Sequence, residues 1–291
     1  MDPLYQSAID GTLKSPAPGP KMPVKILNAT DVAIYIRLVD QNGNLSQPYA
    51  IQAGGGTNLN EAVVNWYAIF TVCSTGAFVC VIQFTAAVRE YTIDRNLLVR
   101  PNDVGKFPAP SQDILIPSDS VRILVGYGVA PNGNPLTREQ YWKRSADSYA
   151  LAPNETRTVG FTTTSGMQTT TTEEKEVAAS LGLSASGGWG PISVSASASL
   201  STTNRTMQQI AVSTETTRYE TVELSNKDAT PKLFLRWQLM DVLTVFAKET
   251  ESRPESPPLA AIVQAVLPVL VGGPYPLSQL GDQLLSTDAS R

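Results

Sequence analysis

Residues 177–201, VAASLGLSASGGWGPISVSASASLS, alternate apolar and small polar side chains along two arms that meet at a glycine-rich centre. Strand side chains point to opposite faces with a period of two, so each arm has an apolar face and a serine-bearing face. If residues 187–190 form the turn, Ser186 lies opposite Pro191 and every apolar residue meets another across the hairpin. A slip of one residue would lose this match, so the stretch predicts a β-hairpin of defined register.

Each arm, 177–186 and 192–201, has about the 9–11 residues with which a tilted strand crosses a bilayer. We therefore interpret the hairpin as a candidate membrane-spanning segment. The positions expected to face lipid are Val177, Ala179, Leu181, Leu183, Ala185, Ile192, Val194, Ala196, Ala198 and Leu200. The positions expected to face an aqueous lumen are Ser180, Ser184, Ser186, Ser193, Ser195, Ser197 and Ser199. The tip is Gly187, Gly188, Trp189 and Gly190, where tryptophan suits an interfacial anchor.

Two plainer interpretations of the same stretch stay open. An ordinary surface hairpin of a two-layer β-protein also alternates, and a serine-alanine run can be a low-complexity linker. Four of the ten apolar positions are alanine, so this face is mild enough to lie on a soluble body. The length of the arms and their register favour insertion.

The composition limits what the protein can do. A chain of 291 residues with 16% charged residues and abundant serine and threonine is typical of a folded, β-rich protein. A net charge of −4 gives no reason to expect a nucleic-acid partner. The chain contains no histidine, which excludes Ser-His-Asp and Cys-His nucleophiles and His-containing zinc sites. We expect no enzyme activity, no cofactor and no metal.

The ends of the chain and its cysteines give three further expectations. The N-terminus lacks a charged start followed by an apolar run, which predicts secretion or release without a recognisable signal peptide. The apolar run 259–273 is too short for a transmembrane helix and is interrupted by Pro268, so we expect a buried helix or strand pair. Cys73 and Cys80 are favoured as buried free thiols over a disulfide, because no wider cysteine framework exists.

The N-terminal part predicts a β-sandwich. Residues 1–22 read as a flexible leader with a proline-rich end, and short β-branched or aromatic segments follow over residues 23–119. This second segment is a possible receptor-binding domain. Its pattern includes, in order, Asn28, Ala29, Thr30, Ile34, Tyr35, Asp40, Gly43, Tyr49 and Trp66. These residues resemble the β-domain of the von Hippel-Lindau tumour suppressor, which implies a sandwich and assigns no binding residue.

Residues 120–291 predict an elongated β-domain with one short helix. The helix is expected over residues 137–146, TREQYWKRSA, because Thr137 and Gln140 have the spacing of a capping box. Tyr141 and Trp142 would be core anchors of this helix or contacts to glycan or lipid. The stretch WQLMDVLTVF, residues 237–246, predicts a long core strand.

Serine and threonine make up 24 of the 61 residues from 161 to 221, which predicts two long hydroxyl-rich arms around the hairpin. Such arms, entered through LAPNETRTVGFTTTSG at residues 151–166, resemble the aerolysin-like β-pore-forming toxins over roughly residues 120–250. The branch that they resemble contains epsilon-toxin, mosquitocidal toxins and insecticidal proteins. The N-terminal sandwich departs from that family.

The resemblance implies a soluble monomer that binds a target-cell membrane, oligomerises with copies of itself and rearranges its hairpins into one closed transmembrane β-barrel. The receptor could be a lipid, a glycan or a protein. The alternative is a β-rich adhesin or lectin-like binding module, which would account for the sandwich and the serine-rich strands without insertion.

Overall fold

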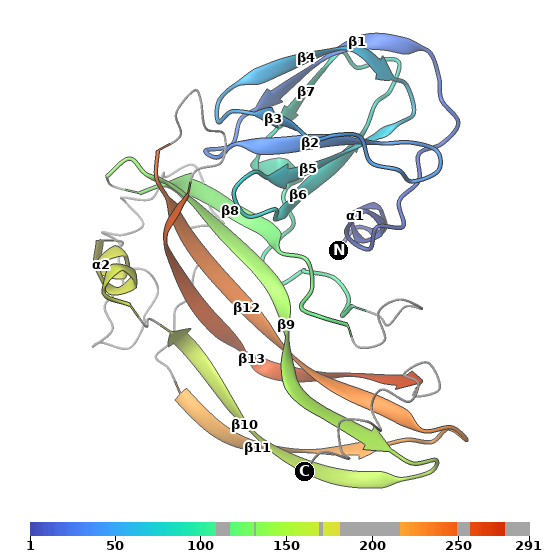
Figure 1. The fold of residues 1–291 in the computed structure, drawn as a ribbon, viewed down its shortest axis with the longest axis vertical. Helices are drawn as coiled ribbons and strands as arrows, with labels where there is room; N and C mark the ends of the chain where they lie inside the picture. Colours follow the sequence, from blue (N-terminus) through green and yellow to red (C-terminus); the bar gives the residue numbers. More distant parts are fainter. Residues whose placement is uncertain (109–116, 131, 169–170, 181–215, 249–256, 277–291) are drawn as a thin grey trace.

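The computed structural model describes residues 1–108, 117–130, 132–168, 171–180, 216–248 and 257–276. This part of the chain is mainly β, with a ten-stranded sheet, a three-stranded sheet and two α-helices (Figure 1). The mainly-β class expected from the short, β-branched segments is confirmed.

Seven strands form a two-layered N-terminal part. They are β1 (Lys21–Asn28), β2 (Ile34–Val39), β3 (Tyr49–Ile51), β4 (Gly56–Val63), β5 (Tyr67–Val72), β6 (Phe78–Gln83) and β7 (Glu90–Ile93). The small sheet has the order β4-β1-β7, and β6-β5-β2-β3 end the large sheet. Every second residue of β1 is buried, which sends Val24 and Ile26 into a core shared with Ile34 and Phe70 of the facing layer.

The large sheet continues into six longer strands. They are β8 (Ile123–Val129), β9 (Pro135–Leu151), β10 (Thr156–Gln168), β11 (Thr216–Ser225), β12 (Lys232–Phe246) and β13 (Pro258–Pro276). Their order is β8-β9-β12-β13-β10-β11, and β8 joins β6 through the single parallel pair Phe78↔Ile123. In Figure 1 the sandwich lies at one end of an elongated molecule, and β10 and β11 lie at the other.

Residues 137–146 lie in strand β9, so the expected helix is wrong. Strand β9 pairs with β8 on one side and with β12 on the other. Leu136 to Tyr141 are all buried, because packing covers both faces of this part of the sheet. Tertiary pairing here overrides the local capping signal. The strand expected at residues 237–246 is confirmed as part of β12.

The apolar run 259–273 lies in one long strand, β13, and forms neither a helix nor a strand pair. Strand β13 pairs with β12 along most of its length, and the register shifts between Leu239↔Val266 and Trp237↔Leu270. Pro268 falls inside this irregular stretch, where the ladder does not require an N–H donor.

The segment that precedes β1 packs against the large sheet, whereas the sequence predicts a flexible leader over residues 1–22. Helix α1 (Pro3–Ile9) is capped by Asp2, and its Tyr5 ring meets Phe78 edge-on at 5.4 Å between ring centroids. Beyond α1, Leu13 is buried and the Ser15 hydroxyl donates to the Val39 carbonyl at 2.6 Å. The same hydroxyl accepts from the Tyr67 amide at 2.8 Å.

Cys73 and Cys80 are buried free thiols, as expected. Burial raises the pKa of the Cys80 thiol well above its usual range, and the nearby Asp94 acts in the same direction. A thiol that holds its proton is a poor nucleophile, so this cysteine is a packing residue.

Substituting Ser15→Ala should destabilise the protein by about 1–3 kcal/mol, because the change leaves a buried carbonyl and a buried amide without a partner. Urea denaturation followed by tryptophan fluorescence measures this. Ser7→Ala is the control, since the Ser7 hydroxyl donates to the Pro3 carbonyl at the exposed surface of α1. Equal effects of the two substitutions would mean that the N-terminal segment does not hold the sheet.

Candidate functional site

The predicted hairpin falls mostly outside the described residues. Of the expected strand positions, the structure describes Val177, Ala179 and Ser180, and it places them in helix α2 (Thr172–Ser180). In this structure these three residues are helical, whereas the prediction places them on the strands of the inserted hairpin. The other predicted membrane-facing, lumen-facing and tip positions, from Leu181 to Leu200, lie outside the described residues.

Local sequence explains helix α2. The Glu174 amide donates to the Thr171 hydroxyl at 3.1 Å, and the Glu174 carboxylate accepts from the Thr171 amide at 3.0 Å. This reciprocal pair is a capping box. Glu173 and Glu174 also place negative charge in the first turn, where the helix dipole favours it. Helix α2 lies against β13.

Strands β10 and β11, which flank the hairpin in the sequence, form an antiparallel two-stranded ribbon that we call the β10–β11 ribbon. It pairs without a bulge from Thr156↔Ser225 to Ser165↔Thr216. The hydroxyls of Thr156 and Ser225 lie 3.0 Å apart across it, within hydrogen-bonding distance.

The two faces of the β10–β11 ribbon differ in chemistry. The face toward the body of the protein holds the buried side chains of Val159, Phe161 and Leu224. Toward the hairpin end this same face becomes polar, with buried Thr163 and Ser165. The other face is rich in hydroxyl groups and mostly exposed: it carries Thr156, Thr158, Thr162, Thr164, Thr217, Tyr219, Thr221, Glu223 and Ser225.

The faces of the ribbon match the faces predicted for the hairpin. In an extended chain, Leu183 lies on the side of buried Phe161, and Leu200 lies on the side of buried Leu224. Extending the observed register would place Val177 opposite Asn204, whereas the hairpin register places it opposite Leu200. The offset of four positions is even, so it leaves every side chain on the same face.

Side chains of β12 hold the ribbon against the body. One edge of β10 pairs with β11, and the other edge pairs with β13 only over Gly166–Gln168. From Thr156 to Ser165 this second edge has no strand partner among the described residues. Instead, the Arg236 guanidinium donates to the Thr162 carbonyl at 3.1 Å, and the Gln238 amide donates to the Thr164 carbonyl at 2.9 Å.

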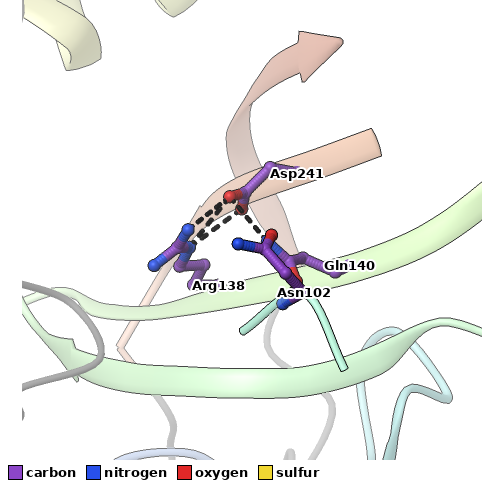
Figure 2. Close-up of polar contacts among 4 residues, drawn as sticks. All are labelled: Asn102, Arg138, Gln140 and Asp241. Carbon is purple, nitrogen blue, oxygen red and sulfur yellow. Dashed lines mark hydrogen bonds and ion pairs between the residues drawn. The ribbon is translucent and has the colours of Figure 1, made fainter. Parts of the chain in front are cut away.

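A buried polar network lies in the middle of the large sheet (Figure 2). Arg138 on β9 donates through Nε to both carboxylate oxygens of Asp241 on β12, each at 3.0 Å. Gln140 donates to Asp241 at 2.9 Å and accepts from the Asn102 amide at 2.7 Å. The network thus ties two long strands to the segment that follows the sandwich.

Glu139, also on β9, joins the sandwich to the long strands. It is fully buried, and its Oε1 accepts from the Thr75 hydroxyl of the β5–β6 turn at 2.7 Å and from Thr137 at 3.1 Å. Arg122 forms an ion pair with Oε2 at 3.7 Å, and no described residue donates a hydrogen bond to that oxygen. Desolvation raises the pKa of the Glu139 carboxyl above its usual range, against the opposing effect of its hydrogen bonds and of Arg122.

Tyr141 and Trp142 serve the core of the sheet. Tyr141 is buried with Met240 and Val242, and Trp142 packs edge-on against Phe107 at 4.9 Å between ring centroids. The Trp142 indole also donates to the Gly105 carbonyl at 3.3 Å. The packing part of the expectation holds for these residues, although their element is a strand.

The described residues contain no group of three or more histidine, cysteine, aspartate or glutamate side chains arranged to hold a metal ion. Within the same described ranges, no helix combines the length and the apolar character needed to cross a membrane.

Neither a protein-family model nor a curated protein matches this chain. Among solved structures, that of Cry35Ab1 is similar, with a TM-score of 0.38 and 13% sequence identity. The match covers 76% of this chain and 63% of the Cry35Ab1 chain. A likeness of this degree carries no conclusion about function, and the resemblance to aerolysin-like toxins stays a prediction.

Substituting Asp241→Asn should destabilise the protein by about 3–5 kcal/mol, because Arg138 would keep its charge in a buried site without a counter-ion. Replacing both Arg138 and Asp241 by leucine should lower the free energy of unfolding by less than the sum of the two single leucine substitutions. Urea denaturation of the parent, the two single variants and the double variant checks this. Glu61→Gln, which removes an exposed partner of Lys21, should change stability little. Strict additivity in the cycle would show that the pair is not coupled.

Glu139 should make the protein less stable as pH rises. Because its folded pKa is raised, its contribution is fully present below its ordinary value of 4.5 and is lost as pH rises through the folded pKa. Thermal unfolding from pH 4.5 to 8 should show this slope in the parent and a smaller slope in Glu139→Gln. Glu61, whose pKa Lys21 lowers, should contribute with the opposite sign. Identical slopes in parent and Glu139→Gln would contradict the assignment.

Proposed function

We propose that this protein is a pore-forming toxin that binds a target-cell membrane, oligomerises and inserts one β-hairpin per subunit into a closed transmembrane β-barrel. The observation that supports this most directly is the exposed hydroxyl-rich face of the β10–β11 ribbon. If both strands continued as extended chain into residues 177–201, this face would carry the serines predicted to line the lumen. Such a face suits the wet interior of a membrane barrel.

Oligomerisation is part of the proposed mechanism for a physical reason. A single hairpin in lipid leaves N–H and C=O groups at both edges without partners, and closure into a ring satisfies them. Six larger aliphatic side chains of the hairpin would contribute on the order of 10 kcal/mol per subunit on entering the membrane. This gain opposes the loss of packing in the soluble form.

Helix α2 is the form in which the first part of the hairpin is stored. Val177, Ala179 and Ser180 can join an extended arm only if α2 unwinds, and the ribbon and hairpin faces become continuous when it does. An isolated helix of this length is marginal in water, so its packing against β13 is what maintains it.

The partners and setting of the protein follow from this proposal. The target is a cell membrane carrying a lipid, glycan or protein receptor, and the sandwich (β1–β7) is the candidate receptor-binding part. The protein acts after secretion or release, without enzymatic activity, in an insecticidal or otherwise cytolytic role. An adhesin or lectin-like module would bind cells equally well and leave their membranes intact.

Charge placed on the two hairpin faces should act in opposite ways. Leu183→Asp or Val194→Asp would put a carboxylate in hydrocarbon, which costs a few kcal/mol in each subunit, so conductance should be lost. Ser184→Asp or Ser195→Asp would face water, so pores should form with a stronger preference for cations. Single-channel conductance and reversal potential in planar bilayers under a salt gradient measure both effects.

Solubility and cell binding of the four variants serve as controls. If Leu183→Asp conducts and Ser184→Asp does not, then Leu183 faces the lumen and Ser184 faces lipid, the reverse of the prediction. If all four variants behave alike, residues 177–201 do not form the wall of the pore. A parent that binds cells and never permeabilises them would favour the adhesin or lectin-like module.

A further inference from the structure

The edge of β10 that faces the body is closed by side chains. Over Thr156–Ser165 no described strand pairs with this edge, and the Thr162 and Thr164 carbonyls accept from Arg236 and Gln238 of β12. Alternate residues of a strand present their backbone groups to the same edge, so these two carbonyls are successive acceptors of one ladder. Arg236 and Gln238 therefore occupy positions that a neighbouring strand would use.

Open space and polar groups border this contact. A pocket of about 330 Å³ is lined by both side chains, and a second of about 610 Å³ is also lined by Arg236. Beside Thr162 and Thr164 the buried face of β10 holds the hydroxyl of Thr163, to which Arg236 also donates at 3.3 Å. The contact at Thr162 and Thr164 is therefore polar, and the apolar packing of the ribbon lies farther from the hairpin, where Val159 and Leu224 pack with Leu151 and Phe234.

Arg236 also contacts β9 and a ring on β10. Its guanidinium forms an ion pair with Asp147 of β9 and lies over the ring of Phe161 of β10, 4.4 Å from the ring centroid. Its side chain is 11% exposed, and its Nε has no hydrogen-bond partner among the described residues. Its pairing with Asp147 does not depend on β10, so Arg236 keeps a partner when β10 leaves.

A second open edge matches the first. Strand β11 ends the large sheet, so its outer edge has no partner among the described strands. The ribbon therefore carries one open edge on β11. Its other edge, on β10, is covered only by side chains over Thr156–Ser165. In a closed ring of identical ribbons, the β10 edge of one copy meets the β11 edge of the next.

We propose that Arg236 and Gln238 are removable caps that keep the β10 edge closed to the β11 edge of a second copy until the ribbon leaves the body. This proposal rests on the proposed pore-forming function, because that function requires the ribbons to pair in a ring. Edge strands that are exposed without protection invite unplanned pairing, and covering the edge prevents it. The caps thus delay assembly in the free subunit.

The first experiment compares Arg236→Met/Gln238→Met with Lys143→Met. Methionine keeps apolar bulk and removes the donors, and Lys143 lines the same cavity without a bond to β10 in the described contacts. In the double variant, amide hydrogen exchange over residues 156–165 and 216–225 should be at least about tenfold faster, which corresponds to about 1.4 kcal/mol. Oligomers should also appear at lower concentration, as measured by light scattering after size-exclusion chromatography.

The second experiment staples the ribbon reversibly. Cysteines at Gln168 and Val263 lie opposite each other across β10 and β13, so their disulfide ties the ribbon to the body. Cysteines at Thr158 and Glu223 lie opposite each other within the ribbon and serve as the control. The first staple should block oligomers and dye release from liposomes until reductant is added, and the second should leave both unchanged.

The outcomes separate the caps from the pore. Exchange in the double variant equal to that of the parent would overturn the caps, whatever happens on membranes. Faster exchange in the double variant, with no dye release from the parent or any variant, would support the capping role of Arg236 and Gln238 and contradict the proposed pore-forming function. Full oligomerisation with the Gln168–Val263 staple closed would overturn the proposal that the ribbon must leave the body.

Discussion

The alternation of side chains along β12 is the constraint on which the rest of the molecule depends. One face of β12 carries Asp241 into the network with Gln140 and packs Trp237 against Phe107. The opposite face carries Arg236 and Gln238 to the edge of β10. A slip of one residue would exchange the two faces. The buried Arg138–Asp241 pair opposes such a slip, because either charge alone in the sheet would be costly.

The two ends of the large sheet are stabilised in different ways. Near the sandwich, β8, β9 and β12 are buried on both faces, β8 pairs with β9, and β12 pairs with β9 and β13. At the far end, the β10–β11 ribbon meets the body through one short ladder, two side-chain donors and a small apolar cluster of Val159 and Leu224 with Leu151 and Phe234. The part of the ribbon nearest the hairpin, at Thr163 and Ser165, is polar where it faces the body, and regions with few buried apolar contacts open at low free-energy cost. The proposed separation of the ribbon would therefore begin at this end.

The sandwich and the long strands are continuous. The sequence suggests a boundary near residue 119, where a proline-rich stretch ends. In the structure, the β6–β8 pair and the Thr75–Glu139 hydrogen bond cross this boundary, and α1 packs on the same junction. A buried carboxylate at the junction makes the contact sensitive to pH as well as to packing.

The sequence by itself determined the mainly-β class, the long core strand of β12 and the free cysteines, because period-two alternation and cysteine spacing are local signals. Two capping-box spacings show what it could not decide. Thr137–Gln140 lies in a strand and Thr171–Glu174 starts a helix, although the spacing is the same. At Thr137 both strand edges find partners, and burial requires every backbone group to be paired in the sheet. At Thr171 the chain leaves the ladder, so the helix satisfies the backbone by itself.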